Sequence, residues 1–240
     1  MVKALILRGP GTNCDMETVY AFELAGAEVN SIFIDTLLKN REKLFESNIL
    51  AIPGGFTYGD DLGAGTVMAA RLNTIKETLQ KFVDNDNLII GICNGFQILV
   101  KMGLLPGFNG RSVTLTLIPR ARFCDQWLRL KVESNRCIFT KGIESFRAPM
   151  ANSEGRFVVK DKSVMRKLED GGYIALRYDG DDPTHSDKSI AGLCDETGRV
   201  FGLMPHPERN LFPHSPPTWQ DGKGGGEGLQ IFKNAIEYFE

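Results

Sequence analysis

The residue best suited to covalent chemistry is Cys93, within the sequence GICNG at 91–95. An apolar run at 88–92 precedes it and a helix-like run at 96–100 follows. This is the strand–turn–helix context of a nucleophile elbow, with sulfur in place of the serine oxygen. The N-terminus of the following helix favours the thiolate, which is the reactive form of cysteine. A buried structural cysteine fits the same five residues, so catalysis requires a base elsewhere in the chain.

The chain has three histidines that could serve as that base: His185, His206 and His214. His206 differs from the other two, which lie in polar or proline-rich loop sequences, because it follows an apolar run in MPHPER at 204–209. Pro207 disfavours helical geometry at His206, so we expect extended backbone there. Positions i and i+2 of an extended chain point to one side, and Glu208 can therefore orient the imidazole. A proline-rich turn with incidental polar residues fits this segment alone equally well, but together with Cys93 it predicts a Cys–His–Glu set.

A second glycine-rich segment, PGGFTYGD at 53–60, follows the apolar run at 49–52. We expect that run to form a strand beside the strand that ends at Cys93. Its glycines would let a backbone N–H approach a substrate closely. One such donor, with the N–H of Asn94, would stabilise the oxyanion of a tetrahedral intermediate. The alternative is a glycine-rich turn that serves topology alone.

The elements that must position these residues alternate in type over the first half of the chain. Apolar, strand-like runs occupy 2–7, 29–34, 49–52 and 88–92. Between them, helices are expected from Asn13 as N-cap to Gly26, over 37–46 and over 65–83. Short apolar strands that alternate with helices predict an α/β fold, with a mostly parallel sheet covered by helices on both faces.

The second half reads differently. Stretches at 112–132, 136–147 and 156–160 are β-like with interleaved Arg and Lys, and we expect them to add antiparallel strands to the main sheet. Strand character returns at 190–193 and 199–204, and a helix is expected over about 227–239. No repeat or linker divides the chain, so we expect one domain over 1–240.

Composition excludes several classes of protein. The net charge of −2 gives no electrostatic reason to expect nucleic acid or an anionic membrane as partner. We expect neither a leader peptide nor a transmembrane helix, since no run reaches ~18 apolar residues. The five cysteines are scattered without a CxxC pair, so no zinc ribbon, other metal site or disulfide framework is expected, and a reducing cytoplasm is the predicted location. The glycine-rich segment 221–226 does not match a P-loop, because its Lys223 is followed by glycine and no strand precedes it.

Taken together, these residues resemble the class I (triad) glutamine amidotransferases, and more narrowly the glutaminase subunits of phosphoribosylformylglycinamidine synthases. The general features are the elbow at Cys93, Gln97 four residues later, and the His206-Pro207-Glu208 segment. The narrower resemblance rests on five segments: GTNCD at 11–15, GGFTYGD at 54–60, EGRF at 154–157, IAGL at 190–193 and MPHPER at 204–209. The resemblance covers nearly the whole chain, and its most specific part is IAGL at 190–193 leading into MPHPER at 204–209.

The resemblance implies a flavodoxin-like fold and a role for each site residue. Cys93 would attack the carboxamide of glutamine to form a γ-glutamyl thioester, His206 would transfer protons, and Glu208 would orient His206. The same resemblance matches the oxyanion donors to Gly55 and Asn94, and a contact with glutamine to Gln97.

The resemblance also implies a partner. Ammonia would pass to a large ATP-dependent synthetase subunit, with or without a small accessory subunit, that converts formylglycinamide ribonucleotide to formylglycinamidine ribonucleotide in purine biosynthesis. ATP and Mg²⁺ would bind that partner, and no cofactor is expected in this chain.

The chain departs from the family pattern at two places. It has Asn152-Ser153 where related subunits usually have His-Gly, and residues 213–226 match poorly. Three other assignments use the same residues: a triad amidotransferase for another synthetase, a stand-alone cysteine hydrolase or redox protein, and a catalytically silent regulatory subunit. The His-Pro-Glu spacing argues against the second, and an intact catalytic set argues against the third.

Overall fold

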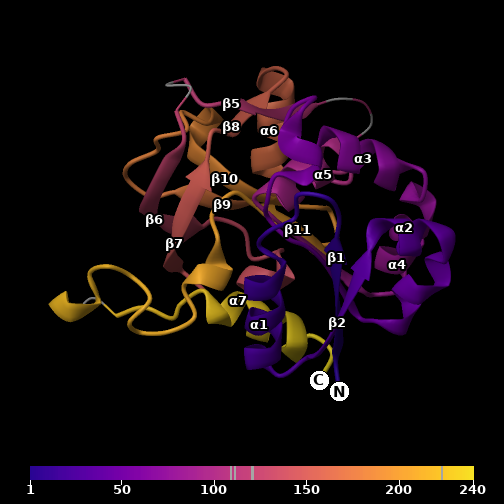
Figure 1. Cartoon of the computed structure of the whole chain (residues 1–240). Coiled ribbons are helices and arrows are strands. Elements are labelled where there is room, and N and C mark those ends of the chain that lie inside the picture. The colour runs from indigo at the N-terminus through magenta and orange to yellow at the C-terminus, as the bar shows by residue number, and fades with distance from the viewer. Residues whose placement is uncertain (109, 111, 120–121, 223) are drawn as a thin grey trace.

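Five parallel strands carry the site, and they lie side by side in a nine-stranded sheet (Figure 1). The computed structural model describes residues 1–108, 110, 112–119, 122–222 and 224–240. The parallel strands stand in the order β2-β1-β3-β4-β11, and their bounds are β1 Lys3–Arg8, β2 Glu28–Phe33, β3 Ile49–Ile52, β4 Leu88–Ile92 and β11 Val200–Leu203. The strands β3, β4 and β11 are buried at every residue, as expected for parallel strands covered on both faces.

Four antiparallel strands extend this sheet beyond β11, in the order β10-β9-β6-β7. Their bounds are β6 Cys124–Val132, β7 Ser145–Asn152, β9 Ile174–Tyr178 and β10 Ile190–Cys194. The expected antiparallel additions are therefore present. One part of that expectation is wrong: β5 (Val113–Leu117) and β8 (Glu154–Val159) pair with each other in a separate two-stranded sheet. β8 follows β7 after a single residue, and its chain leaves the main sheet at that point.

Helices cover both faces of the parallel region. The helices α1 (Asp15–Ala25) and α7 (Leu229–Glu237) pack together on one face, and α3 (Thr66–Asn73) packs with α5 (Asn94–Met102) on the other (Figure 1). The chain moves one way along the sheet from β1 to β2 and the opposite way from β3 to β4. Because both crossovers are right-handed, the helices of the two connections lie on opposite faces of the sheet. The remaining helices are α2 (Ile34–Lys39), α4 (Lys76–Asp84) and α6 (Lys162–Asp170), of which α6 packs against β8.

Three helix boundaries differ from those predicted. The expected helix over 65–83 is two helices, since α3 ends at Asn73 and α4 begins at Lys76. The expected helix over 37–46 is α2 followed by a 3-10 helix at Arg41–Glu46. Asn13 does not cap α1: Cys14 is the N-cap, and Asn13 accepts a hydrogen bond from the Cys14 thiol instead.

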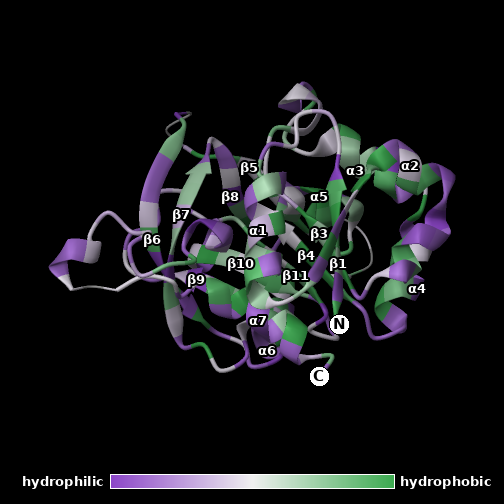
Figure 2. Ribbon diagram, turned by 60° about the horizontal axis from the view of Figure 1, so that its bottom comes forward, coloured by the Kyte–Doolittle hydropathy of each residue, from purple (hydrophilic) through white to green (hydrophobic). Residues whose placement is uncertain are grey.

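The buried core runs from the first strand to the last helix, and Figure 2 shows apolar residues gathered along the central strands. Close packing of α5 on β3 depends on Gly95, because a Cβ there would lie 1.9 Å from the carbonyl oxygen of Ile52. Within the described ranges, the helices are too short or too polar to cross a bilayer. Lys223, on which the P-loop comparison turned, lies outside the described residues.

Candidate active site

Cys93 lies at the turn between β4 and α5, as predicted. Its backbone has φ 52° and ψ −105°, a conformation that L-residues rarely adopt and that costs about 1–3 kcal/mol. The turn is held on one side by the Cys93 N–H, which donates to the carbonyl of Leu203 at 2.8 Å. It also requires glycine at 91, where a Cβ would lie 2.6 Å from the backbone of Gly95. The fold therefore forces the thiol out of the strand end, at the N-terminus of a nine-residue helix.

His206 and Glu208 form a buried pair. The Nδ1 atom of His206 lies 2.6 Å from Oε1 of Glu208, and their side chains are 2% and 0% exposed. The predicted pairing is present, but the predicted backbone is wrong: Pro207–Arg209 forms a 3-10 turn. Proline at the first position of a helical turn is favourable, and it disfavours helix only at the residue before it, so His206 alone is non-helical (φ −105°, ψ 89°).

The protonation state of His206 follows from its neighbours. Burial lowers the pKa of the imidazole, but the Glu208 carboxylate and the Cys93 sulfur raise it, and the net result is a pKa well above the usual value. The arrangement therefore favours an imidazolium beside the sulfur of Cys93. A Cys–His pair of this kind can attack a carbonyl carbon and then protonate a leaving group.

A second thiol lies against the same imidazole. The sulfurs of both Cys93 and Cys14 raise the pKa of His206, and Sγ of Cys14 lies within 4.8 Å of a ring nitrogen of His206. Only glycine fits between them, since a Cβ on Gly54 would lie 2.8 Å from Cε1 of His206, 3.1 Å from Sγ of Cys14 and 3.4 Å from Cβ of Cys93. Burial raises the pKa of the Cys14 thiol, and that thiol donates to Oδ1 of Asn13 at 3.2 Å. Cys14 is thus held as a neutral thiol, which is a poor nucleophile.

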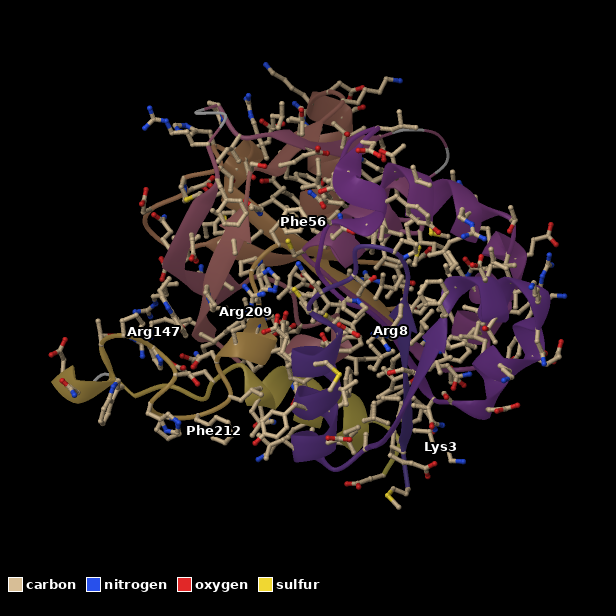
Figure 3. All side chains as sticks on the ribbon, in the orientation of Figure 1. Lys3, Arg8, Phe56, Arg147, Arg209 and Phe212 are labelled. Carbon is tan, nitrogen blue, oxygen red and sulfur yellow. The ribbon has the colours of Figure 1, made fainter. Side chains whose placement is uncertain are left out.

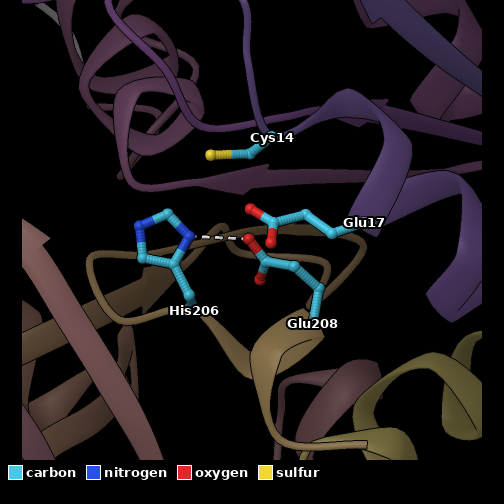
Figure 4. Close-up of side chains that lie close together, drawn as sticks. All are labelled: Cys14, Glu17, His206 and Glu208. Carbon is cyan, nitrogen blue, oxygen red and sulfur yellow. Dashed lines mark hydrogen bonds and ion pairs between the residues drawn. The ribbon is translucent and has the colours of Figure 1, made fainter.

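Behind the imidazole, Cys14 and Glu208 lie close to Glu17 (Figure 4). One ligand atom from each of Cys14, Glu17, His206 and Glu208 lies within 4.8 Å of the others, and all four are types that bind zinc. Each of the four side chains, however, already has a partner within the protein, although Oε2 of Glu208 has none among the described residues. Arg209 donates to Glu17 at 2.7 Å and to Sγ of Cys14 at 3.2 Å, and Glu208 bonds His206. The Arg209 guanidinium also places a positive charge beside these four side chains, which opposes the binding of a cation. We therefore assign the other three side chains to support of the base, His206.

Two backbone N–H groups are available for an oxyanion. Neither the N–H of Gly55 nor that of Asn94 donates to another group in the part of the chain that the structure describes. Gly55 has φ 146° and packs so tightly that a Cβ would lie 2.7 Å from the carbonyl oxygen of Gly11. The sharp turn at Gly55 and the first turn of α5 both border the cavity that contains Cys93.

The side chains of Asn94 and Gln97 tie this region together. Oδ1 of Asn94 accepts from the hydroxyl of Thr57 at 2.6 Å, which joins α5 to the loop that contains Gly55. Nδ2 of Asn94 donates to Oε1 of Gln97 at 3.1 Å, and Nε2 of Gln97 donates to the carbonyl of Glu154. Gln97 thus borders the cavity with its amide oriented by two protein groups.

The cavity at this site has a volume of about 120 Å³. Besides Cys93 and His206, its walls come from six parts of the chain: Asn13 and Cys14; Gly55, Phe56, Asp60 and Ala64; Gln97; Phe123; Ala151, Asn152, Ser153 and Glu154; and Arg209. Figure 3 shows Phe56 and Arg209 near the centre of the view, where the carboxyl ends of the parallel strands meet. The six predicted residues Cys93, His206, Glu208, Gly55, Asn94 and Gln97 are thus brought together in and around one cavity.

Sequence reasoning missed the supporting residues. Arg209 lies 192 positions after Glu17 and 195 after Cys14, so no local spacing connects it with them. One signal was available. The segment GTNCD at 11–15 follows β1, and PGGF at 53–56 follows β3. Because the carboxyl ends of parallel strands lie along one edge of a sheet, both segments are expected at that edge. The ion pair of Lys101 with Glu154, at 3.3 Å, could not be predicted from local sequence either, because the two residues are 53 positions apart.

Residues 1–239 match the family described as the CobB/CobQ-like glutamine amidotransferase domain. The chain is 45% identical to a phosphoribosylformylglycinamidine synthase subunit PurQ of Dehalococcoides mccartyi, over 99% of this chain and 97% of that one. It is 38% identical to the PurQ subunit of Methanococcus maripaludis, with the same two coverages. Among solved structures it superposes on a chain of PurLQS from Thermotoga maritima with a TM-score of 0.79 and 34% identity, covering 100% of this chain and 99% of that one. A second solved structure, from Thermoplasma acidophilum, is 14% identical with a TM-score of 0.62 and shares the fold.

Proposed function

Because the chain belongs to the family of CobB/CobQ-like glutamine amidotransferase domains, we propose that it is the glutaminase subunit of a phosphoribosylformylglycinamidine synthase, with residues 1–240 as one amidotransferase domain. One observation carries the assignment of residues: Cys93 and His206 line one cavity, and Nδ1 of His206 lies 2.6 Å from Oε1 of the buried Glu208. The full-length likeness to PurQ subunits supports the choice of acceptor.

In the first half of the reaction, the Cys93 thiolate attacks the carboxamide carbon of glutamine. The carbonyl oxygen becomes an oxyanion, which accepts hydrogen bonds from the N–H groups of Gly55 and Asn94. The His206 imidazolium then protonates the departing nitrogen, the C–N bond breaks, and ammonia leaves a γ-glutamyl thioester on Cys93. Glu208 keeps the ring in one orientation and stabilises its positive charge.

In the second half, neutral His206 takes a proton from water as the water oxygen attacks the thioester carbon. The same two N–H groups stabilise the second oxyanion. The C–S bond breaks, glutamate leaves, and the thiolate and imidazolium are restored. No cofactor enters either half, since each step moves only protons and an acyl group.

The partner in this proposal is an ATP-dependent synthetase, which binds ATP and Mg²⁺ and uses the ammonia to amidate formylglycinamide ribonucleotide. The solved PurLQS complex from Thermotoga maritima gives the precedent for such an assembly. A cytoplasmic location agrees with five cysteines that are all free.

The test is glutamate release from glutamine by the purified chain, alone and with the synthetase, ATP and formylglycinamide ribonucleotide. We expect release to rise with the complete system and to be lost in Cys93→Ala. Release that depends on Cys93 but ignores that system would indicate another acceptor. Absence of release under all conditions would indicate a silent subunit.

A further inference from the structure

A second cysteine lies beside the nucleophile and takes no step in the reaction proposed above. Cys14 is 3% exposed and Cys93 is 6% exposed, and both line the same cavity. A Cβ on Gly54 would lie 3.1 Å from Sγ of Cys14 and 3.4 Å from Cβ of Cys93, so the two atoms are no further apart than about twice those distances. Because residue 54 is glycine, its side chain does not separate the two thiols, and both are free in the structure.

The surroundings of Cys14 supply what a thiol needs in order to attack a neighbouring sulfur. Its Sγ lies within 4.8 Å of a ring nitrogen of His206, and Figure 4 shows its side chain directed toward that ring. Nη2 of Arg209 donates to the same sulfur at 3.2 Å, and Cys14 is the N-cap of α1. A neutral imidazole at this place can accept the thiol proton, and the guanidinium and the helix N-terminus stabilise the thiolate that forms.

We propose that Cys14 is the resolving thiol for Cys93, and that a Cys14–Cys93 disulfide forms when a peroxide oxidises the nucleophile; this regulation of the active site rests on the proposed function. Cys93 is oxidised first, because its sulfur is paired with the His206 imidazolium and a thiolate is the form that peroxide oxidises. A disulfide is reduced again by thiols, whereas a sulfinic acid is not. Cys14 therefore makes the loss of activity reversible.

The two steps balance with hydrogen peroxide as the oxidant. The Cys93 thiolate attacks one peroxide oxygen, the O–O bond breaks, and the His206 imidazolium protonates the departing hydroxide, which leaves as water. Cys93 is then a sulfenic acid and His206 is neutral. His206 next takes the proton of the Cys14 thiol as that sulfur attacks Sγ of Cys93. The S–O bond breaks, the departing hydroxide takes the proton from His206, and a second water leaves, so the two sulfurs have given two electrons to the peroxide.

The test treats the reduced, purified chain with hydrogen peroxide and uses two readouts. Peptide mass spectrometry should find a cross-linked pair of peptides that contains Cys14 and Cys93 and that separates on treatment with dithiothreitol. Glutamate release, measured afterwards with the complete synthetase system, should be lost on oxidation and should return on reduction.

The variants Cys14→Ser and Cys14→Ala remove the resolving thiol. After the same treatment, their Cys93 should react with dimedone as a sulfenic acid and then become a sulfinic acid, and dithiothreitol should not restore activity. Each variant is compared with its own untreated sample, because Cys14 lies against the base, and thermal unfolding confirms the fold. The matched control is Cys124→Ser, which removes a half-buried thiol from β6 and should form the cross-link and recover as wild type does.

Oxidation of wild-type Cys93 to a sulfinic acid without the cross-link would overturn the inference. Recovery of Cys14→Ser to the same extent as wild type would also overturn it, as would a cross-link from Cys93 to another cysteine. The mass readout does not depend on glutamine. If untreated wild type released no glutamate with the complete synthetase system, the proposed function would fail, and the fate of the two thiols would still be measured.

Discussion

Replacing Gly54 with alanine tests the geometry of the site through one methyl group. The backbone at Gly54 is compatible with an L-residue, since it does not lie in the left-handed region. The added Cβ would lie 2.8 Å from Cε1 of His206 and 3.4 Å from Cβ of Cys93. The effect of the substitution is therefore steric, and it falls between the nucleophile and the base.

The expected size follows from these distances. Carbon atoms in contact stand about 3.5–4.0 Å apart, so His206 must move by about 1 Å to accept the methyl group. Its ring cannot move freely, because Glu208 holds Nδ1 at 2.6 Å and the His206 backbone N–H donates to the carbonyl of Pro149 at 2.8 Å. A displacement of about 1 Å from productive geometry can cost about 10²-fold in rate. We expect kcat of Gly54→Ala to fall by about that factor, with a smaller change in KM.

The assay is steady-state glutamate release in the complex with the synthetase, with thermal unfolding to confirm the fold. Gly224→Ala is the control, because Gly224 also has ordinary backbone geometry and a Cβ there meets nothing within 4 Å. Its kcat should match wild type. A Gly54→Ala enzyme that keeps kcat within about threefold of wild type would refute the steric reasoning.

Three further predictions follow from the site and its packing. In a Cys93→Ala background, Glu208→Gln should lower the pKa of His206, because the carboxylate raises it; imidazole NMR titration measures this, and an unchanged pKa would contradict the pairing. In the same background, protonated His206 stabilises the fold fully below its unfolded pKa of about 6.5, and that stability is lost as pH rises through the raised folded pKa. The difference in unfolding free energy between the protein that keeps Glu208 and its Glu208→Gln variant should therefore shrink from about pH 6 upward in urea titrations, and a difference that grows with pH would contradict the sign. Gly95→Ala should destabilise the chain by more than about 3 kcal/mol, since its Cβ would lie 1.9 Å from the carbonyl of Ile52, and a urea midpoint equal to wild type would contradict that packing.

The first half of the fold could be predicted because its sequence repeats one pattern. Ile49–Ile52 and Leu88–Ile92 are short apolar runs ended by glycine-rich turns, and both are strands with those bounds. The break between α3 and α4 carried no such signal, since neither proline nor glycine interrupts the residues from Asn73 to Lys76. The separate pairing of β5 with β8 was also not predicted, because an alternation of apolar and polar residues indicates a strand but not its neighbour in a sheet.

The residues that we propose as catalytic could be selected from the sequence because each lies in a local pattern. Cys93 has its glycine-flanked turn, and Glu208 follows His206 by two positions. Cys14 and Arg209 could not be placed in this way, since their contact at 3.2 Å joins residues 195 positions apart. The buried amide of Asn152 has no hydrogen-bond partner among the described residues, and the sequence could not predict this because pairing depends on the three-dimensional surroundings.

The presence of two thiols beside one imidazole makes the identity of the acylated cysteine the most direct test. The complex would be treated with the diazoketone analogue of glutamine, 6-diazo-5-oxo-norleucine, which alkylates the attacking thiol, and then digested for peptide mass spectrometry. The strained turn, the free N–H donors and the neutral state of Cys14 predict that the label is found on Cys93 alone. A label on Cys14, or loss of activity with Cys93 unmodified, would contradict the assignment of the nucleophile.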